Sequence, residues 1–233
     1  MRLLSFAAAL AALPAAASAL TYVIEAPGLA GPVAVTPLQT AESLVDFYGY
    51  AAGRATPPFA MVAGRAQFFL VETSTETGAA ALGLGAILGP GDGDGSGSAI
   101  FSLYGAPGAA FGLVRDDPGS DMVGWSSDPD VNGAFSFAWG DAQADGFLFA
   151  GIGAATWTMT FSSFAGISGI TDWTFLSGDA TDPTVLGLGA LNFGALTVTA
   201  SEAPEVPLPA AAPMLAAGLA GLALIGRGRR ARV

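Results

Sequence analysis

The chain has 233 residues, of which 52% are hydrophobic and 12% are charged, and it contains neither Cys nor His. This length and hydrophobic content suffice for one sizeable domain. The absence of Cys excludes disulfides, thiol nucleophiles and Cys-ligated zinc, and the absence of His removes the commonest general base and metal ligand. Catalysis by carboxylates alone remains possible.

Acidic and basic residues are unevenly distributed along the chain. Every acidic residue lies between Glu25 and Glu205, where 3 Arg stand against 19 acids, a net charge of −16. Four further Arg lie in the last seven positions. A surface this acidic repels nucleic-acid phosphates and anionic lipid, so we expect a soluble domain with no nucleic-acid partner.

Residues 1–19 have the three parts of a secretory signal peptide. Arg2 supplies the positive start, an apolar run follows, and Ala17 and Ala19 flank Ser18 as a small-x-small cleavage site. The apolar run is too short to span a bilayer. We therefore predict removal by signal peptidase, with the mature chain beginning near Leu20.

Residues 20–201 are predicted to form the extracytoplasmic domain, and their hydrophobic pattern is mainly that of β-strands. The clearest strand is 156–161, in which Thr alternates with Trp, Met and Phe. Gly, Asp and Pro separate further short apolar runs, at 22–25, 67–72, 100–104, 135–137, 147–149 and 195–199. Many short strands between turn residues predict an all-β fold, an antiparallel sandwich or jelly-roll-like domain.

One helix is predicted near the start of this domain. Residues 36–39, Thr-Pro-Leu-Gln, resemble a capping box with Pro at the first helical position. In such a helix, Leu38, Ala41, Val45 and Tyr48 would share one face. Because Val, Phe and Tyr also favour strands, the same stretch remains compatible with β-structure.

The sequence Leu-Gly-Leu-Gly-Ala occurs at 82–86 and again at 186–190. In a strand, each copy would place Leu on one face and bare Gly on the other, which allows an aromatic ring or a second backbone to approach closely. A duplicated half-domain and a chance recurrence in a Gly-rich chain both account for the repeat. Neither copy has the spacing of a dinucleotide-binding loop.

The glycine-rich segment 91–98 contains the one candidate metal site. Asp92, Asp94 and Ser96 alternate with Gly, as oxygen ligands do in the first half of an EF-hand calcium loop. The position of the bidentate Glu is occupied by Leu103, so the second half does not match. Calcium is therefore the single cofactor candidate, and a solvated hairpin loop without metal is the alternative.

An acidic region follows, interrupted by Pro118 and Pro129. Its carboxylates raise the alternative of a glycoside hydrolase, which needs two carboxyl groups about 5–10 Å apart. Acidic residues beside prolines are also typical of ordinary turns. The acids of this region are Asp116, Asp117, Asp121, Asp128 and Asp130.

The four Trp residues are the largest aromatic anchors of the domain. Trp157 and Trp173 lie in apolar patterns and are predicted to be in the core, where large aromatic side chains are usually found. Trp125 lies among Gly and Ser, in a predicted loop. It is the candidate for stacking against a sugar ring.

The last segment changes composition sharply. Residues 202–210 form a proline-bearing linker and motif, and 211–226 contain no charged residue, which predicts a transmembrane helix. The Arg cluster in 227–233 is predicted to stay in the cytoplasm and to stop transfer. The motif residues are Val206, Pro207, Leu208, Pro209 and Ala210, and the stop-transfer residues are Arg227, Arg229, Arg230 and Arg232.

This tail resembles the PEP-CTERM group of sorting tails, in its VPLPA variety. The resemblance covers about the last 30 residues, in which motif, apolar helix and Arg cluster follow in the same order. It implies an exported protein of a Gram-negative bacterium that makes extracellular polysaccharide. It also implies that an exosortase, a membrane-embedded cysteine transpeptidase, cuts the tail near the motif.

Together these features predict an exported surface or extracellular-matrix protein that is not an enzyme. Its expected partners are signal peptidase, an exosortase-type transpeptidase, the membrane through the terminal helix, and extracellular polysaccharide. Two alternatives remain open: a secreted glycoside hydrolase that uses carboxylates, and a surface domain whose membrane anchor is never cut.

Overall fold

The computed structural model describes the domain that follows the predicted signal peptide. All described residues belong to one compact unit, Ala19–Glu202. At Leu103, Val131, Asn132 and in the strands 112–115 and 122–126, the backbone alone is described. The described residues are 20–48, 59, 62–77, 81–89, 97–105, 112–115, 122–126, 131–139, 145–152, 156–191 and 194–202.

One sheet, here called sheet A, contains seven strands in the order β2-β1-β14-β11-β6-β9-β8. All neighbouring strands in it are antiparallel. Its strands are β1 (Leu20–Glu25), β2 (Val33–Val35), β6 (Gly97–Gly105), β8 (Met122–Ser126), β9 (Val131–Trp139), β11 (Trp157–Ser168) and β14 (Leu196–Glu202).

The second sheet, sheet B, has the order β13-β12-β4-β5-β10-β7, and β3 also pairs with β4. The pairs β4–β12 and β4–β3 are parallel, so the expectation of a purely antiparallel sandwich is wrong for this sheet. These partners are not joined to β4 by tight hairpins, which would force an antiparallel pair. The strands are β3 (Leu38–Thr40), β4 (Arg65–Thr73), β5 (Leu82–Leu88), β7 (Gly112–Arg115), β10 (Asp145–Ala150), β12 (Asp172–Gly178) and β13 (Pro183–Gly187).

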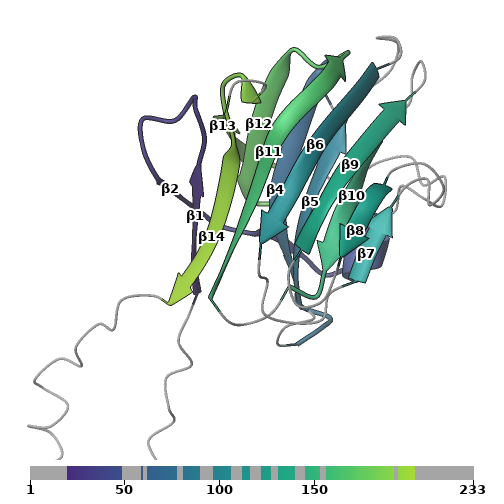
Figure 1. Cartoon of the computed structure of the whole chain (residues 1–233). Coiled ribbons are helices and arrows are strands. Elements are labelled where there is room, and N and C mark those ends of the chain that lie inside the picture. Colours follow the sequence, from purple (N-terminus) through teal and green to yellow (C-terminus); the bar gives the residue numbers. More distant parts are fainter. Residues whose placement is uncertain are drawn as a thin grey trace, which may run out of the picture. The chain divides into compact units, whose positions relative to one another are not determined.

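The two sheets pack face to face, and the predicted all-β sandwich is confirmed (Figure 1). Phe68 of β4 meets Phe161 of β11 with ring centroids 5.3 Å apart. Phe101 of β6 lies 5.8 Å from Phe147 of β10. These contacts join strands of different sheets, so the main hydrophobic core lies between the layers.

Strand β11 shows why the sequence pattern produces this arrangement. Trp157, Met159 and Phe161 are buried in the core between the sheets. Thr158 and Thr160 alternate with them and point to the opposite face, as the two-residue repeat of a strand requires. Each core residue of this size contributes roughly 1.5–3 kcal/mol through burial.

A second, smaller core covers the outer face of sheet B. The short helix α1 (Leu44–Tyr48) places Phe47 and Tyr48 over this face. Phe47 contacts Phe69 of β4 edge to face, with centroids 6.0 Å apart, and Phe59 contacts the same ring at 5.4 Å. The central strands of sheet B are therefore buried on both sides, and every residue of β5 is buried.

The helix begins later than the sequence predicts. Residues 38–40 form β3, which pairs with β4, so the backbone at the predicted start is used in a sheet. Ser43 caps the helix instead: its Oγ accepts the Asp46 N–H at 3.1 Å and donates to the Asp46 carboxylate at 2.6 Å. This reciprocal pair satisfies a free N–H of the first turn.

The two Leu-Gly-Leu-Gly-Ala segments have different surroundings. The first lies in β5, where a Cβ at Gly85 would come within 2.9 Å of the Phe69 ring and 2.8 Å of the Phe147 carbonyl oxygen. The second leaves β13 after Gly187, a position with open space around it. Close aromatic approach to bare glycine therefore occurs in the first copy and is absent at Gly187.

This contrast gives a matched pair of substitutions. Gly85→Ala forces a methyl group against fixed backbone and is expected to lower the free energy of unfolding by about 1–3 kcal/mol. Gly187→Ala places the same methyl group in open space and should change it by less than about 0.5 kcal/mol. Urea denaturation of both variants measures the difference, and equal effects would contradict the packing described for β5.

Candidate functional site

The two ends of the described domain meet in sheet A. Strand β1 begins at Leu20 and β14 ends at Glu202, and these two residues pair with each other. The predicted signal cleavage site, at Ala17 and Ala19, lies outside the described residues, as do the sorting motif 206–210 and the Arg cluster 227–232. Their roles therefore remain predictions from the sequence.

The predicted calcium ligands Asp92, Asp94 and Ser96 also lie outside the described residues. The segment that carries them connects β5 of sheet B to β6 of sheet A. Within the described ranges, no group of three or more acidic residues is placed to hold a metal ion. The calcium hypothesis remains a prediction from the glycine-rich segment.

Three of the four Trp side chains belong to the core. Trp139, Trp157 and Trp173 are 4%, 4% and 5% exposed, which confirms the core prediction made for Trp157 and Trp173. Trp125 lies in β8, rather than in the loop expected from its neighbours. Its side chain is not among those described, so stacking of Trp125 on a sugar remains a prediction.

The carboxylates on which the glycosidase alternative was based, at 116–130, lie outside the described residues. Two carboxylates that are described already have partners in the fold. Asp145, 5% exposed, accepts the N–H groups of Ala138 at 3.0 Å and Gly146 at 2.7 Å. Asp172 pairs with Arg65 at 2.8 Å and connects β12 to β4. Asp145 and Asp172 thus help to hold their strands in place.

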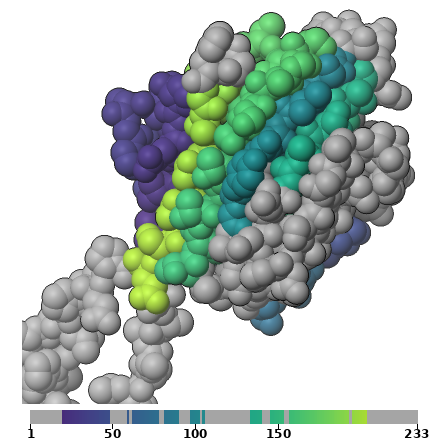
Figure 2. All heavy atoms as spheres, in the orientation of Figure 1, coloured from purple at the N-terminus to yellow at the C-terminus, as the bar shows by residue number. Residues whose placement is uncertain are grey.

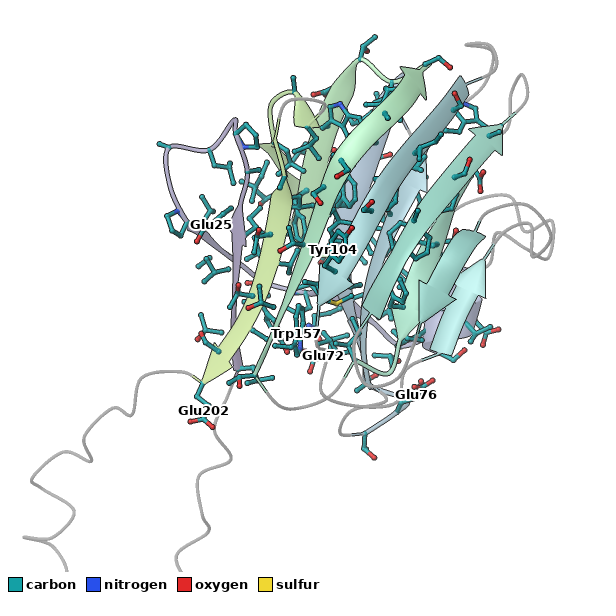
Figure 3. All side chains as sticks on the ribbon, in the orientation of Figure 1. Glu25, Glu72, Glu76, Tyr104, Trp157 and Glu202 are labelled. Carbon is teal, nitrogen blue, oxygen red and sulfur yellow. The ribbon has the colours of Figure 1, made fainter. Side chains whose placement is uncertain are left out.

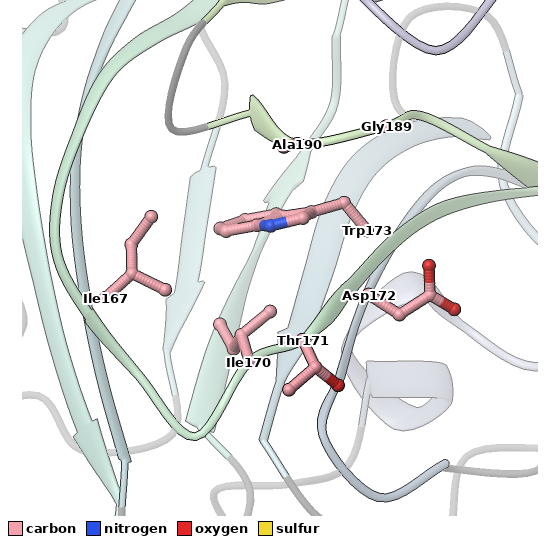
Figure 4. Close-up of a pocket in the computed structure, with 7 residues that line it drawn as sticks. All are labelled: Ile167, Ile170, Thr171, Asp172, Trp173, Gly189 and Ala190. Carbon is pink, nitrogen blue, oxygen red and sulfur yellow. The ribbon is translucent and has the colours of Figure 1, made fainter.

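One pocket of about 350 Å³ opens beside β12 (Figure 4). Its volume is at the lower end of the range for small-molecule sites. The indole of Trp173 lies across it, between Ala190 and Ile170. The described lining residues are Ile167, Ile170, Thr171, Asp172, Trp173, Gly189 and Ala190.

The chemistry of this pocket is limited. Asp172 is the one carboxylate among the described lining residues, and Arg65 neutralises it. The Thr171 hydroxyl donates to the Gly64 carbonyl oxygen at 3.3 Å. Carboxylate glycosidases need a second carboxyl group, which these lining residues do not supply. The pocket therefore offers no acid–base pair.

The outer face of sheet A has a different character, and we call it the open face. In Figure 2 the atoms of β14, β11 and β6 form the front surface of the domain. Strands β11 and β14 contribute a set of short hydroxyl side chains: Thr158, Thr160, Ser162, Thr197, Thr199 and Ser201. Strands β6 and β9 contribute Ser98, Ile100, Ser102, Tyr104 and Ser136.

Strand register arranges these side chains in rows. Thr197 of β14 pairs with Thr160 of β11, which pairs with Tyr104 of β6. The Thr160 and Thr197 hydroxyl oxygens are 3.4 Å apart, and those of Thr158 and Thr199 are 3.3 Å apart. Each Thr pair uses one O–H as donor, so a second O–H and several lone pairs remain for another partner.

Two large side chains on the open face are exposed to solvent. Ile100 is 41% exposed and Tyr104 is 47% exposed, and Figure 3 shows Tyr104 on sheet A. Neither carries a charge, and the described outward residues of β14, β11, β6 and β9 contain no charged group. The outward side chains of these four strands are thus neutral, and Glu25 of β1, which pairs with Thr197, adds an exposed carboxylate at the edge of the open face.

Ionisable groups cluster at one end of the sandwich. Tyr22 of β1 lies beside Trp157, with ring centroids 6.4 Å apart, and Figure 3 shows Trp157 and Glu72 at this end. Burial raises the pKa of the Tyr22 hydroxyl, and the Glu72 charge raises it further.

In a surface turn, the Thr181 hydroxyl and N–H donate hydrogen bonds to the Asp179 carboxylate and lower its pKa.

No family model, no curated protein and no solved structure matches this chain. Within the described ranges, no helix has both the length and the apolar character to cross a membrane. The predicted transmembrane helix, 211–226, lies outside those ranges.

The raised pKa of Tyr22 predicts a specific alkaline sensitivity. The unfolded chain ionises this hydroxyl near pH 10 while the folded chain keeps its proton. The free energy of unfolding therefore falls as the pH rises from that value through the folded pKa. Glu72→Gln should lower the pKa of Tyr22 in a tyrosinate absorbance titration, with burial keeping it above the ordinary value.

The control is Glu76→Gln, which removes a different acid, since burial and Glu72 are the causes of the raised pKa of Tyr22. Tyr22→Phe should abolish the corresponding part of the pH dependence of stability. An unchanged titration in Glu72→Gln would show that this charge does not reach the Tyr22 hydroxyl.

Proposed function

We propose that this chain is an exported, non-catalytic surface or extracellular-matrix protein of a Gram-negative bacterium. Signal peptidase removes the first 19 residues, and an exosortase-type transpeptidase processes the tail near 206–210. The protein then remains at the cell surface or in the surrounding polysaccharide. Its partners are these two enzymes, the membrane before processing, and extracellular polysaccharide.

One observation carries the proposal: the order of features in the last 28 residues. The Val206–Ala210 motif, the uncharged segment 211–226 and the Arg cluster follow one another without interruption. The two prolines of the motif prevent a helix from continuing through it and favour an extended backbone. An extended segment next to an apolar helix is suited to recognition by a membrane-embedded peptidase.

The limits of the folded domain are consistent with this proposal. Strand β1 starts at the first residue of the predicted mature chain, and β14 ends three residues before the motif. Removing both predicted ends would therefore leave all described strands intact. The paired residues Leu20 and Glu202 would lie near the two new termini.

A non-catalytic role is supported by the chemistry available. The sequence has no His and no Cys, and Asp145 and Asp172 are engaged in the fold. Acid–base catalysis needs groups held within hydrogen-bond reach of a reacting atom in a site. The described pocket has a single carboxylate, already paired with Arg65.

The first test is the intact mass of the protein isolated from its native envelope and medium. We expect a mass that extends from Leu20 to a residue near 206–210. Replacing both motif prolines, Pro207→Ala and Pro209→Ala, should prevent loss of the tail, because the extended recognition segment is lost.

Pro213→Ala is the matched control, since it removes a proline from the same tail outside the motif. It should be processed as the unaltered chain is. A native protein that still ends at Val233 and stays in the membrane would overturn the processing proposal and leave a permanently anchored domain.

A separate activity assay tests the glycosidase alternative. Hydrolysis of soluble glycans that is lost in Asp117→Asn or Asp130→Asn would support that alternative.

A further inference from the structure

We infer that the open face of sheet A is a binding platform for neutral polysaccharide. This inference rests on the proposed surface function and names the class of polysaccharide and the surface that takes it. The outer faces of the two sheets differ in how they are covered. Phe47, Tyr48 and Phe59 cover sheet B, whereas the outward residues of β11, β14 and β6 are exposed or half-buried.

The functional groups of the open face match those of a sugar chain. Sugar hydroxyls both donate and accept hydrogen bonds, as the Thr and Ser hydroxyls of the platform do. The Thr160–Thr197 pair and the Thr158–Thr199 pair each retain an unused O–H. Tyr104 adds an exposed ring, on which the apolar face of a pyranose can pack.

The geometry of the platform suits an extended ligand. Neighbouring strands lie about 4.8 Å apart, so the row Thr197–Thr160–Tyr104 presents polar groups at regular intervals across about 10 Å. A parallel row is formed by Ser162 and Ser102. A polysaccharide lying across the strands meets repeated hydroxyl groups and one aromatic ring, and it needs no deep cleft.

Charge restricts the polysaccharide to a neutral one. The mature region carries 3 Arg against 19 acids, a net charge of −16, and it repels an anionic polymer. The described residues of the four central strands place no Arg on the open face that would pair with a uronate or sulfate. Glu25, which lies beside Thr197 on this face, adds to that repulsion, whereas a neutral polysaccharide experiences none.

Other partners fit the face less well. Protein interfaces are enriched in aromatic residues, Met and Arg and depleted of Ser and Ala. Tyr104 is the one aromatic side chain among the described outward residues of β14, β11, β6 and β9, whereas Ser102, Ser136 and Ala134 lie at the centre of this face. Membrane and nucleic-acid surfaces require basic side chains, which the described open face lacks. Neutral polysaccharide remains the partner that its hydroxyl groups and ring favour.

Native gel electrophoresis through dissolved polysaccharide provides the test, since an acidic protein migrates well and binding slows it. The protein is used as exported by its native cell, whichever tail it carries. The neutral polymers are mixed-linkage β-glucan and galactomannan, and alginate is the anionic one. We expect retardation by at least one neutral polymer and none by alginate.

Two variants probe the platform. Tyr104→Ala removes the ring and should weaken binding by about 3- to 10-fold, the range expected for one aromatic packing contact. The double variant Thr160→Val with Thr197→Val keeps the shape of the Thr197–Thr160–Tyr104 row and removes both Thr hydroxyls. It should weaken binding by roughly fivefold or more. Tyr104, Thr160 and Thr197 all face outward from sheet A. Thermal melts of each variant check that the fold is kept.

The controls lie on β13, in the other sheet. Val185→Ala and Thr184→Val make comparable changes at exposed positions and should leave retardation unchanged. The inference is overturned if no neutral polymer retards the protein, if alginate retards it more strongly, or if the control variants lose binding equally.

Light scattering tests whether the open face binds a second copy of the chain instead. A concentration-dependent dimer that is dissociated by Tyr104→Ala would overturn the polysaccharide inference and assign the face to that second copy. Failure here is distinguishable from failure of the proposed function, because the gel measures binding whether or not the tail is cut. The intact mass reports processing whether or not polysaccharide binds.

Discussion

Aromatic packing between the two sheets is the interaction on which the rest of the structure depends. Phe101 lies within 6 Å of five other Phe rings, from β9, β10 and β11. Its partners Phe135 and Phe147 are 5.8 Å apart and belong to opposite sheets. A chain without disulfides has no covalent cross-link between its layers apart from the backbone connections, so burial of these rings must keep the sheets packed together. Once each strand commits its large residues to this core, its alternate residues must face outward.

The outward residues then divide the domain into two unlike surfaces. On sheet B they are Phe69, Leu148 and Leu176, which need cover and receive it from α1 and Phe59. On sheet A they are mainly Ser, Thr and Ala, which are stable in contact with water. The difference follows from the sequence of each strand, because residues 68–71 of β4 are apolar without interruption whereas β11 alternates. One outer face is therefore covered by the chain itself, and the other is exposed to solvent.

Sequence reasoning predicted the parts of the fold that are local. Thr156–Phe161 was predicted to be a strand because alternation needs no knowledge of its partners, and its Trp and Phe are buried as expected. The helix was placed too early, since residues 38–40 gain more by pairing with β4, a contact that no local signal reveals. The open face was missed for the same reason: Thr197, Thr160 and Tyr104 share a row only because strands distant in sequence pair in this register. The Thr alternation in 156–160 and 197–199 was its visible signal.

Strand β14 connects the two parts of the functional argument. It carries Thr197 and Thr199 on the open face and Val198 in the core, and its last residue is the first of the predicted linker before the predicted sorting motif. Because Glu202 pairs with Leu20, the point where the chain enters the domain lies beside the point where it leaves. Both points are at one end of the β1–β14 pair. Attachment through the tail would therefore hold the domain by a strand of the same sheet that presents the hydroxyl rows. Under the proposed function, the domain would be fixed at the end of β14 while the open face of the same sheet would meet the surrounding polymer.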